Sequence, residues 1–322
     1  MKILLTGGLG YIGSNLAEKL SLENEVYVVD LGIYETKLKP DANIHIIKED
    51  IRNIEWDPLF ENGFDYVYHL AGISNDPGYG IDDEVGNAIN YESSVKLFEK
   101  CKEYNIKRFI YPSSCSVYGH REEDEIVDET ATPNPLTNYA KNKLLVENYI
   151  TDNYGIMPYT ILRPATVFGL SYRQRFDLVV NSFLLKMWYN EDICVSNRRN
   201  YRPSLFIDDL IKIYIEILQN KKTENKIYNV AANNMTLEEV FWRIKNNIST
   251  TSRLMDEECD ASRSYRVSSQ KIINDFDSKI IFTSIEDGIE GLKNSISKGC
   301  FDDYNTNTNY YGRLRQPIFF GR

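Results

Sequence analysis

The chain has 322 residues, of which 42% are hydrophobic and 26% are charged, and its formal net charge at pH 7 is −10. This length suffices for one large domain or two fused domains with a sizeable core. The negative charge argues against binding to nucleic acids or to anionic membrane surfaces, so we expect neither as a partner.

Cysteine and histidine usage argues against disulfide bonds and metal binding. The five cysteines are scattered without a CxxC pair, and none of the three histidines lies in a metal-binding spacing. The apolar run at residues 3–5 is too short for a signal peptide, and no stretch approaches the roughly 20 apolar residues of a membrane span. We therefore expect a reduced, cytoplasmic protein that binds no metal.

Apolar runs in the first half predict strands, and segments with helical periodicity predict helices between them. In chain order, the expected elements are a strand at 2–8, a helix at 11–20, strands at 25–30, 43–50 and 64–72, a helix at 83–104, a strand at 106–114, a helix at 139–154 and a strand at 159–169. Such alternation indicates parallel strands joined by crossover helices. The predicted fold class is therefore α/β, a Rossmann-type doubly wound parallel sheet.

The second half of the chain follows a less regular pattern. It predicts a loop and helix at 170–188, a strand end that leads into a helix at 202–218, a strand at 226–231, helices at 236–247 and 285–297, and an irregular tail at 305–322. The Thr–Glu spacing at 236–239 is typical of a helix start. We infer a smaller C-terminal substrate-binding region that is threaded around the first half.

A glycine-rich turn follows the first strand and opens the first helix. Gly7, Gly10 and Gly13 recur at every third position. Glycines at such a turn let the backbone approach a pyrophosphate, and the helix N-terminus at Tyr11 and Ile12 offers N–H groups to its charge. The strand–turn–helix context makes this motif a predicted dinucleotide site.

Asp30 ends the second strand, where a carboxylate can accept hydrogen bonds from ribose hydroxyls. The same carboxylate would repel a 2′-phosphate, so the predicted cofactor is NAD rather than NADP. The remaining predicted cofactor contacts lie at or after the ends of the third and fourth strands: Asp50, Ile51, Leu70, Ala71 and Gly72.

Ser114 ends the fifth strand, and the carboxyl ends of parallel strands are where ligands bind in such sheets. Tyr139 and Lys143 are four residues apart in a predicted helix, so they lie on one helix face. In a chain with 23 tyrosines this pair alone carries little information. A Ser-His-Asp hydrolase is not indicated, because no GxSxG motif is present and histidines are few.

Several motifs occur in the order found in a known family. They are "TGGLGYIG" at 6–13, "DI" at 50–51, "HLAG" at 69–72, Asn90, "SSCSVYG" at 113–119, Tyr139-x-x-x-Lys143 and "LRPATVFG" at 162–169. Through them the chain resembles the extended short-chain dehydrogenase/reductases. Within these it is similar to the NAD-dependent nucleotide-sugar epimerase/dehydratase family, including UDP-glucose 4-epimerases. The resemblance covers nearly the whole chain.

The resemblance implies a role for each residue of the Ser114, Tyr139 and Lys143 set. Tyrosine has an ordinary pKa of about 10, and a nearby ammonium favours its phenolate. Tyr139 would then take the proton of a sugar hydroxyl while hydride passes to the cofactor. Lys143 would also hold the nicotinamide ribose, Ser114 would bond the reacting oxygen, and Asn90 would be structural.

The resemblance also implies domain limits. Residues 1–165 would form the NAD-binding domain, with 204–232 packing back onto it, and residues 166–203 and 233–322 would bind the nucleotide sugar. The family's 4,6-dehydratases carry Asp-Glu directly after the catalytic Ser or Thr, and those acids eliminate water. This chain has Cys115-Ser116 there, so dehydration is not expected.

Arginines suit a diphosphate because their forked N–H groups match its oxygens. Arg202 and Arg263 resemble the family's two diphosphate arginines, and Asn181 resembles its substrate-loop asparagine. Arg173 and Arg175 form a further pair in "SYRQR", and we include Arg175 among the predicted substrate contacts.

The expected function is a nucleotide-sugar 4-epimerase that acts on a nucleotide-diphosphate sugar. The run "ATVFGLSYRQRFDLVVN" at 165–181 also resembles enzymes that oxidise C4 of a nucleotide-linked heptose, such as a GDP-heptose. That keeps a C4 dehydrogenase open, and a non-enzymatic dinucleotide-sensing module is a third interpretation. A homodimer is expected, because the family pairs the helices near 84–104 and 139–154 across a two-fold axis.

Overall fold

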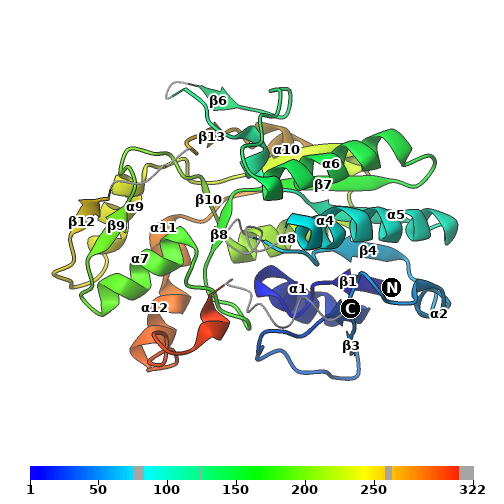
Figure 1. Cartoon of the computed structure of the whole chain (residues 1–322), viewed down its shortest axis with the longest axis horizontal. Helices are drawn as coiled ribbons and strands as arrows, with labels where there is room; N and C mark the ends of the chain where they lie inside the picture. Colours follow the sequence, from blue (N-terminus) through cyan, green and yellow to red (C-terminus); the bar gives the residue numbers. More distant parts are fainter. Residues whose placement is uncertain (75–82, 123–124, 258–262, 312–322) are drawn as a thin grey trace.

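The computed structural model of the chain describes residues 1–74, 83–122, 125–257 and 263–311, which form two lobes (Figure 1). The larger lobe contains a seven-stranded parallel sheet in the order β11-β7-β5-β4-β1-β2-β3, which confirms the predicted fold class. Its strands are β1 (Lys2–Thr6), β2 (Glu25–Asp30), β3 (Ile44–Lys48), β4 (Tyr66–His69), β5 (Arg108–Pro112), β7 (Tyr159–Pro164) and β11 (Lys226–Val230).

Helices cover both faces of this sheet. One face packs against α1 (Tyr11–Ser21) and α8 (Ile207–Ile217), and the other against α2 (Trp56–Phe60), α5 (Ser93–Glu103) and α6 (Asn138–Asn153). Strands β5 and β7 are buried at every position, as expected for parallel strands covered on both sides. Within the described segments, no helix is both long enough and apolar enough to cross a membrane.

The helix predicted at 83–104 contains an irregular turn. It consists of α4 (Asp83–Asn87), a π-helical turn (Ala88–Glu92) and α5. Asn90 lies in the π turn, where its amide accepts a 2.7 Å hydrogen bond from Ile73 N and donates one of 2.9 Å to Ile73 O. Asn90 therefore fixes the loop that follows β4, which is the structural role we expected.

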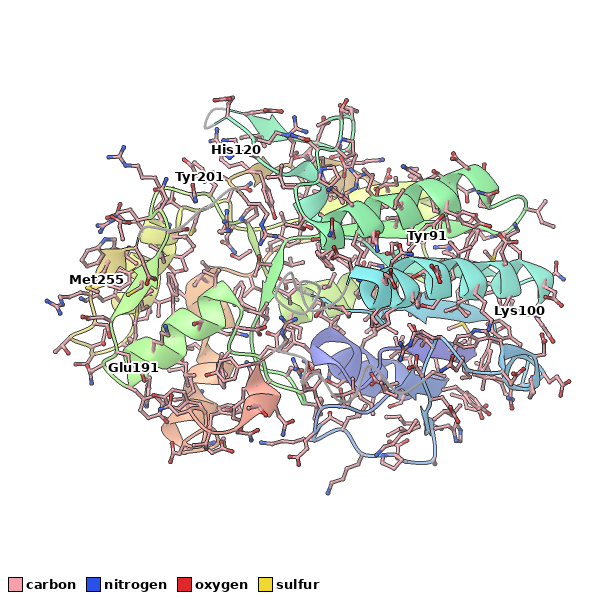
Figure 2. All side chains as sticks on the ribbon, viewed as in Figure 1. Tyr91, Lys100, His120, Glu191, Tyr201 and Met255 are labelled. Atoms are coloured by element: carbon pink, nitrogen blue, oxygen red, sulfur yellow. The ribbon has the colours of Figure 1, made fainter. Side chains whose placement is uncertain are left out.

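The smaller lobe has its own apolar core, which lies on the left in Figure 1. Figure 2 shows Glu191 and Met255 on this lobe and Lys100 on the helical layer of the larger one. Its elements are α7 (Val179–Trp188), the parallel pair β9 (Ile193–Val195) and β12 (Leu254–Asp256), α9 (Leu237–Lys245), α11 (Ile285–Gly288) and α12 (Glu290–Ser297). A capping box between Thr236 and Glu239 starts α9, as the sequence predicts.

Short elements connect the lobes or lie beside them. The strand pairs are β8 (Thr166–Phe168) with β10 (Ser204–Phe206), and β6 (Ile126–Val127) with β13 (Arg266–Val267). The remaining helix is α10 (Gln270–Asp275), and single 3₁₀ turns cover Cys115–Tyr118, Lys221–Thr223 and Thr308–Tyr310.

Two predicted elements are divided in the structure. The strand predicted at 159–169 ends at Pro164, and the chain then leaves the sheet as β8 to pair with β10. A proline has no N–H to continue a ladder, and it commonly ends pairing in this way. The helix predicted at 285–297 breaks between α11 and α12, beside Gly288 and Gly291, where each glycine weakens a helix by about 1 kcal/mol relative to alanine.

A buried ion pair joins α6 to β7. Arg163 donates to both carboxylate oxygens of Glu147, with Nε–O distances of 3.0 and 3.1 Å and an Nη2–Oε2 distance of 2.5 Å. The side chains of Arg163 and Glu147 are 5% and 1% exposed, and Arg163 Nη1 also donates to the hydroxyl of Tyr118. This pair sets the position of α6 relative to the sheet.

We expect Glu147→Gln to lower the free energy of unfolding by about 3–5 kcal/mol, because it leaves the buried guanidinium without a countercharge. Urea denaturation measures this loss. The matched control is Glu103→Gln, which removes an exposed carboxylate that pairs with Lys100, and its unfolding midpoint should stay near that of the wild type. Equal midpoints for the two variants would contradict the role given to the buried pair.

Candidate active site

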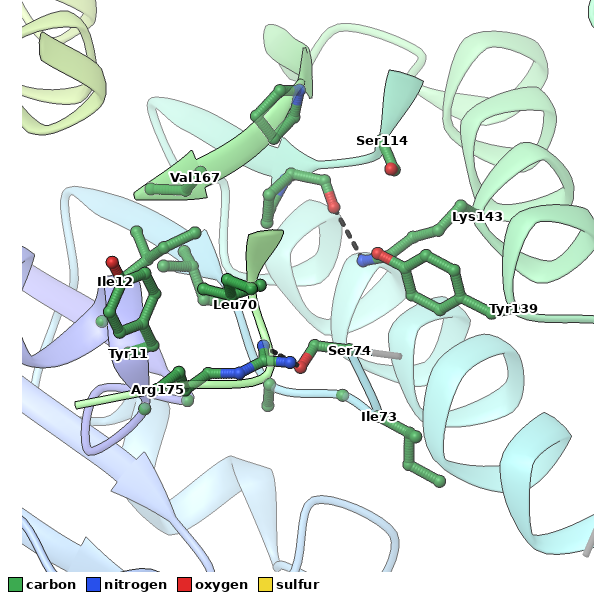
Figure 3. Close-up of a pocket in the computed structure, with 18 of the residues that line it drawn as sticks. Tyr11, Ile12, Leu70, Ile73, Ser74, Ser114, Tyr139, Lys143, Val167 and Arg175 are labelled. Carbon is green, nitrogen blue, oxygen red and sulfur yellow. Dashed lines mark hydrogen bonds between the residues drawn. The ribbon is translucent and has the colours of Figure 1, made fainter. Parts of the chain in front are cut away.

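A cavity of about 540 Å³ lies at the carboxyl ends of the sheet strands, beside the point where the strand order reverses between β1 and β4. Both lobes line it, and Figure 3 shows part of its wall. The predicted site residues that line it are Gly7, Gly10, Tyr11, Ile12, Asp30, Asp50, Ile51, Leu70, Ala71, Gly72, Ser114, Tyr139, Lys143, Arg175, Arg202 and Arg263.

The glycine-rich turn forms one end of the cavity. Gly7 has a φ of +73°, and a Cβ there would lie 2.5 Å from Ala71 N, while a Cβ on Gly13 would lie 2.1 Å from Gly7 O. These glycines therefore allow the turn to pack closely against the β4 loop and the start of α1. The first N–H groups of a helix have no intrahelical partner, so the start of α1 offers donors to an anion.

Asp30 lies at the end of β2 on the same wall. Its Oδ2 accepts a 3.0 Å hydrogen bond from Leu9 N and its Oδ1 accepts one of 2.8 Å from Gly32 N, and burial raises its pKa. Each carboxylate oxygen keeps a second lone pair, which suits ribose hydroxyls. Asp50 is instead bound to Arg52, so its side chain is already engaged. A glycine-lined turn, a helix start and a diol acceptor together fit a dinucleotide.

Ser114, Tyr139 and Lys143 come together on another part of the wall (Figure 3). Thr137 caps α6 by accepting a hydrogen bond from Ala140 N, so Tyr139 and Lys143 fall in the first two turns of this helix. Ser114 caps the 3₁₀ turn, and its Oγ accepts a 3.1 Å hydrogen bond from Ser116 N. The Ser114 hydroxyl proton can therefore be donated to a substrate oxygen.

Lys143 is a buried cation, 9% exposed, beside two aromatic rings. Its Nζ donates a 2.7 Å hydrogen bond to Pro112 O and lies 4.6 Å from the ring centre of Tyr111 and 6.0 Å from that of Tyr139. Burial lowers its pKa to about 8, against an upward contribution from Glu147. Pro112 O is its hydrogen-bond acceptor among the described residues, so an ammonium with three N–H groups can also donate to Tyr139 and to a ligand.

Two polar residues beside the site are unsuited to acid–base catalysis or nucleophilic attack. His69 is 1% exposed and bonded to Thr6 and Ser94, and burial lowers its pKa to about 3, so it stays neutral. Cys115 is fully buried, its thiol donates to Arg163 O, and burial raises its pKa. Both are packed, hydrogen-bonded residues.

Asn181 does not line the cavity, although the sequence suggested a substrate contact. It is fully buried in α7, and its amide accepts a hydrogen bond from Gly169 N at 2.9 Å. The same amide donates to Arg175 O at 2.9 Å and to the Tyr11 hydroxyl at 3.0 Å. Two of these contacts hold the loop at 169–177 and the third holds Tyr11 of α1, so Asn181 supports the cavity wall without facing the cavity.

Arg202, Arg263 and Tyr265 line the cavity from the second half of the chain. Arg202 Nη1 donates to Tyr201 O and to Arg263 O, and burial lowers the pKa of Arg202. Among the residues that the structure describes, these backbone acceptors bring no countercharge to Arg202, which is suitable for a diphosphate. The arginines predicted for the substrate thus do share one cavity with the Ser114 and Tyr139 side chains.

Some lining residues were not predicted as contacts. Ser74 and Asp177 bind Arg175, while Ser113 and Ser116 lie beside Ser114 and carry buried Oγ atoms without a hydrogen-bond partner among the described residues. Ser113 and Ser116 belong to the quoted "SSCSVYG" motif, so their closeness to Ser114 in the sequence could have predicted that they line the cavity. Asp177 lies in the quoted run at 165–181, whereas Ser74 belongs to no quoted motif and the fold alone brings it to the cavity.

We expect Lys143→Met to raise the free energy of unfolding at pH 7 by up to about 3 kcal/mol, at 1.36 kcal/mol per pKa unit. The folded protein binds the Lys143 proton less tightly than the unfolded chain, so wild-type stability rises between pH 8 and 10.5. The advantage of the variant should therefore be largest below pH 8 and shrink towards pH 10.5.

Urea denaturation across this pH range tests the expectation, with Lys141→Met, an exposed lysine of the same helix, as control. If the difference in free energy of unfolding between Lys143→Met and the wild type does not change with pH, burial does not disfavour the charged form of Lys143.

Comparison with known proteins gives a consistent result. The family model described as "NAD dependent epimerase/dehydratase family" matches residues 3–231. An uncharacterized UDP-glucose epimerase of Bacillus subtilis, YtcB, is 30% identical over 234 residues, covering 66% of this chain and 71% of that protein. A putative UDP-glucose 4-epimerase of Methanocaldococcus jannaschii is 29% identical over 276 residues, covering 82% and 88%.

The chain is also similar to a solved structure of UDP-glucuronic acid 4-epimerase from Bacillus cereus in complex with UDP-glucuronic acid and NAD. The TM-score is 0.81 and the identity is 26%, and the match covers 92% of this chain and 99% of that one. The UDP-glucose 4-epimerase of Thermotoga maritima shares the fold, with a TM-score of 0.84 and 24% identity. The match covers 93% of this chain and 100% of that one. The chain therefore belongs to the NAD-dependent epimerase/dehydratase family, and NAD is its cofactor.

Proposed function

We propose that the protein is a nucleotide-sugar 4-epimerase that inverts the C4 hydroxyl of a UDP-linked sugar. The observation that carries the proposal is the meeting of Ser114, Tyr139 and Lys143 in one cavity, with Arg202 and Arg263 on the same cavity wall. The putative UDP-glucose 4-epimerase of Methanocaldococcus jannaschii and the UDP-glucuronic acid 4-epimerase of Bacillus cereus are similar to this chain over most of its length. Their names supply the base and the position on the sugar.

Three side chains perform the proton chemistry in this proposal. When bound, NAD supplies a reversible hydride acceptor next to the sugar. Tyr139 takes the proton of the C4 hydroxyl and later returns it, and the Lys143 ammonium stabilises the phenolate that this requires. Ser114 donates a hydrogen bond to the C4 oxygen, which keeps that oxygen in reach of Tyr139 on both passes.

The residues beside Ser114 support epimerisation over elimination of water. A dehydratase needs an acid and a base next to this position, whereas Cys115 is buried and bonded to a backbone carbonyl and Ser116 is a neutral hydroxyl. Arg202 and Arg263 would hold the diphosphate at a distance from the reacting carbon, so that the sugar can present either face. A dinucleotide sensor would have no use for the Ser114 and Tyr139 pair.

The test is incubation of the purified protein with UDP-glucose, UDP-glucuronic acid and UDP-N-acetylglucosamine in deuterium oxide, followed by NMR. We expect a C4 epimer that retains the original hydrogen at C4. Tyr139→Phe should lower turnover by about 10²–10⁴, the usual contribution of a positioned base, and leave NAD bound. Accumulation of a 4-keto sugar with reduced cofactor and no epimer would identify a C4 dehydrogenase instead.

We also propose a homodimer that pairs the α4–α5 helix and α6 with their copies across a two-fold axis. On α6, Leu145 is 46% exposed, whereas Val146 is 1% exposed and packs inward. Leu145 therefore has to carry most of the apolar contact from α6. Tyr91 lies on the neighbouring helix (Figure 2).

Sedimentation velocity at micromolar concentration should show a dimer for the wild type and a shift to monomer for Leu145→Lys. The control is Ile281→Lys, which changes an 86% exposed isoleucine far along the chain. A wild-type protein that sediments only as a monomer would refute the dimer.

A further inference from the structure

The loop at residues 169–177, here called the arginine loop, is fastened to the first turns of α1. The Tyr11 hydroxyl donates to Gly169 O at 2.8 Å, and the Ser171 hydroxyl donates to Tyr11 O at 2.6 Å. Asn15 donates to Leu170 O at 3.1 Å. The loop therefore lies against the helix start that borders the glycine-rich turn, although it is about half a chain away in sequence.

Internal hydrogen bonds give the arginine loop a defined shape. Gln174 accepts from Ser171 N at 3.0 Å and donates to Gly169 O and Arg175 O, and Asn181 donates to Arg175 O from behind. Gln174 is 4% exposed and Asn181 is fully buried. These buried amides hold the backbone of Arg175 and its neighbours, so the arginine side chains start from a fixed backbone.

Arg173 is buried without a complete set of partners. It is 4% exposed, its guanidinium lies 4.0 Å from the ring centre of Tyr34, and it lines the cavity together with Asp30. Its Nε is buried and has no hydrogen-bond partner among the described residues. A buried guanidinium donor without an acceptor is costly, so the site is built for an acceptor that a ligand brings.

Arg175 is buried beside it, 7% exposed, but is held differently. It binds both oxygens of Asp177 at 2.8 Å and donates to Ser74 Oγ at 3.0 Å (Figure 3). Arg175 therefore links the arginine loop to the loop after β4, while Arg173 lies towards Asp30 and Tyr34. Burial, together with the repulsion from the Arg175 guanidinium, lowers the pKa of Arg173 to about 10. An anion between or beside them would relieve that repulsion.

We propose that Arg173, with Arg175 as its support, binds the pyrophosphate of NAD together with the glycine-rich turn, and so retains the cofactor between turnovers. The retention of NAD between turnovers rests on the proposed function. An epimerase returns the hydride to the sugar from the same cofactor molecule, so NAD has to stay bound until the reaction is complete. It also revises the assignment of Arg175, which the sequence suggested for the sugar nucleotide. Arg202 and Arg263 then remain for the substrate diphosphate.

The test measures binding of the cofactor alone, so it is independent of any sugar or turnover. Calorimetry compares NAD, ADP-ribose, adenosine and UDP on the wild type and on Arg173→Gln after bound nucleotide has been removed. Loss of a charge-assisted hydrogen bond should weaken NAD and ADP-ribose by about 10–100-fold, with faster release of NAD. Adenosine and UDP, which do not carry the NAD pyrophosphate, should bind within about twofold of wild type.

Two further variants complete the design. Arg253→Gln removes the same charge from a side chain that is 75% exposed, and its NAD affinity should match that of the wild type. Arg173→Lys keeps the charge without the fork and should fall between wild type and Arg173→Gln, and it replaces the glutamine variant if that one does not fold.

Three results would overturn the proposal. Unchanged NAD affinity in the folded Arg173 variants would show that the guanidinium does not reach the cofactor. Weaker UDP binding with unchanged NAD binding would assign Arg173 to the substrate diphosphate. Wild-type affinity for NADP equal to that for NAD, lost on Arg173→Gln, would place the arginine at the 2′ position of the ribose rather than at the pyrophosphate.

Discussion

The ion pair between Arg163 and Glu147 is the interaction on which the site depends. Glu147 is one helical turn beyond Lys143 on α6, and a carboxylate at that spacing would ordinarily pair with the lysine. Arg163 occupies both of its oxygens from β7. The pair thus fixes the catalytic helix against the sheet and leaves the ammonium of Lys143 bonded to the Pro112 carbonyl instead of to an acid.

Three cations that line the cavity, unlike Arg175, take part in no ion pair within the described part of the chain. Lys143 and Arg202 donate to backbone carbonyls, and Arg173 packs on an aromatic ring, so these charges are held in place without being neutralised. Each arrangement costs folding free energy in the empty protein. That cost is recovered when the phosphates and hydroxyls of ligands arrive, which is why strained cations gather at functional sites rather than in the core.

The sequence predicts the sheet and the glycine-rich turn well, because both depend on local spacing. Ser114, Tyr139 and Lys143 do line one cavity, and their catalytic roles stay a prediction. Features that depend on distant contacts escaped it. The exit of β8 from the sheet follows from its pairing with β10, and the burial of Asn181 follows from its contacts with Gly169, Arg175 and Tyr11 of α1. Val146 resembles Leu145 in every local property, and only the packing of α6 shows which of them faces inward.

The position of β11 has a consequence for biosynthesis. This strand completes the edge of the sheet next to β7, yet it is made only after α7, β9 and α8. A ribosome that has released residues 1–165 has therefore produced a sheet with an unpaired edge on β7, which is open to wrong partners until residue 230 emerges. The larger lobe therefore completes its sheet only after α7 and β9 of the smaller lobe have been synthesised, while α9, β12, α11 and α12 still follow.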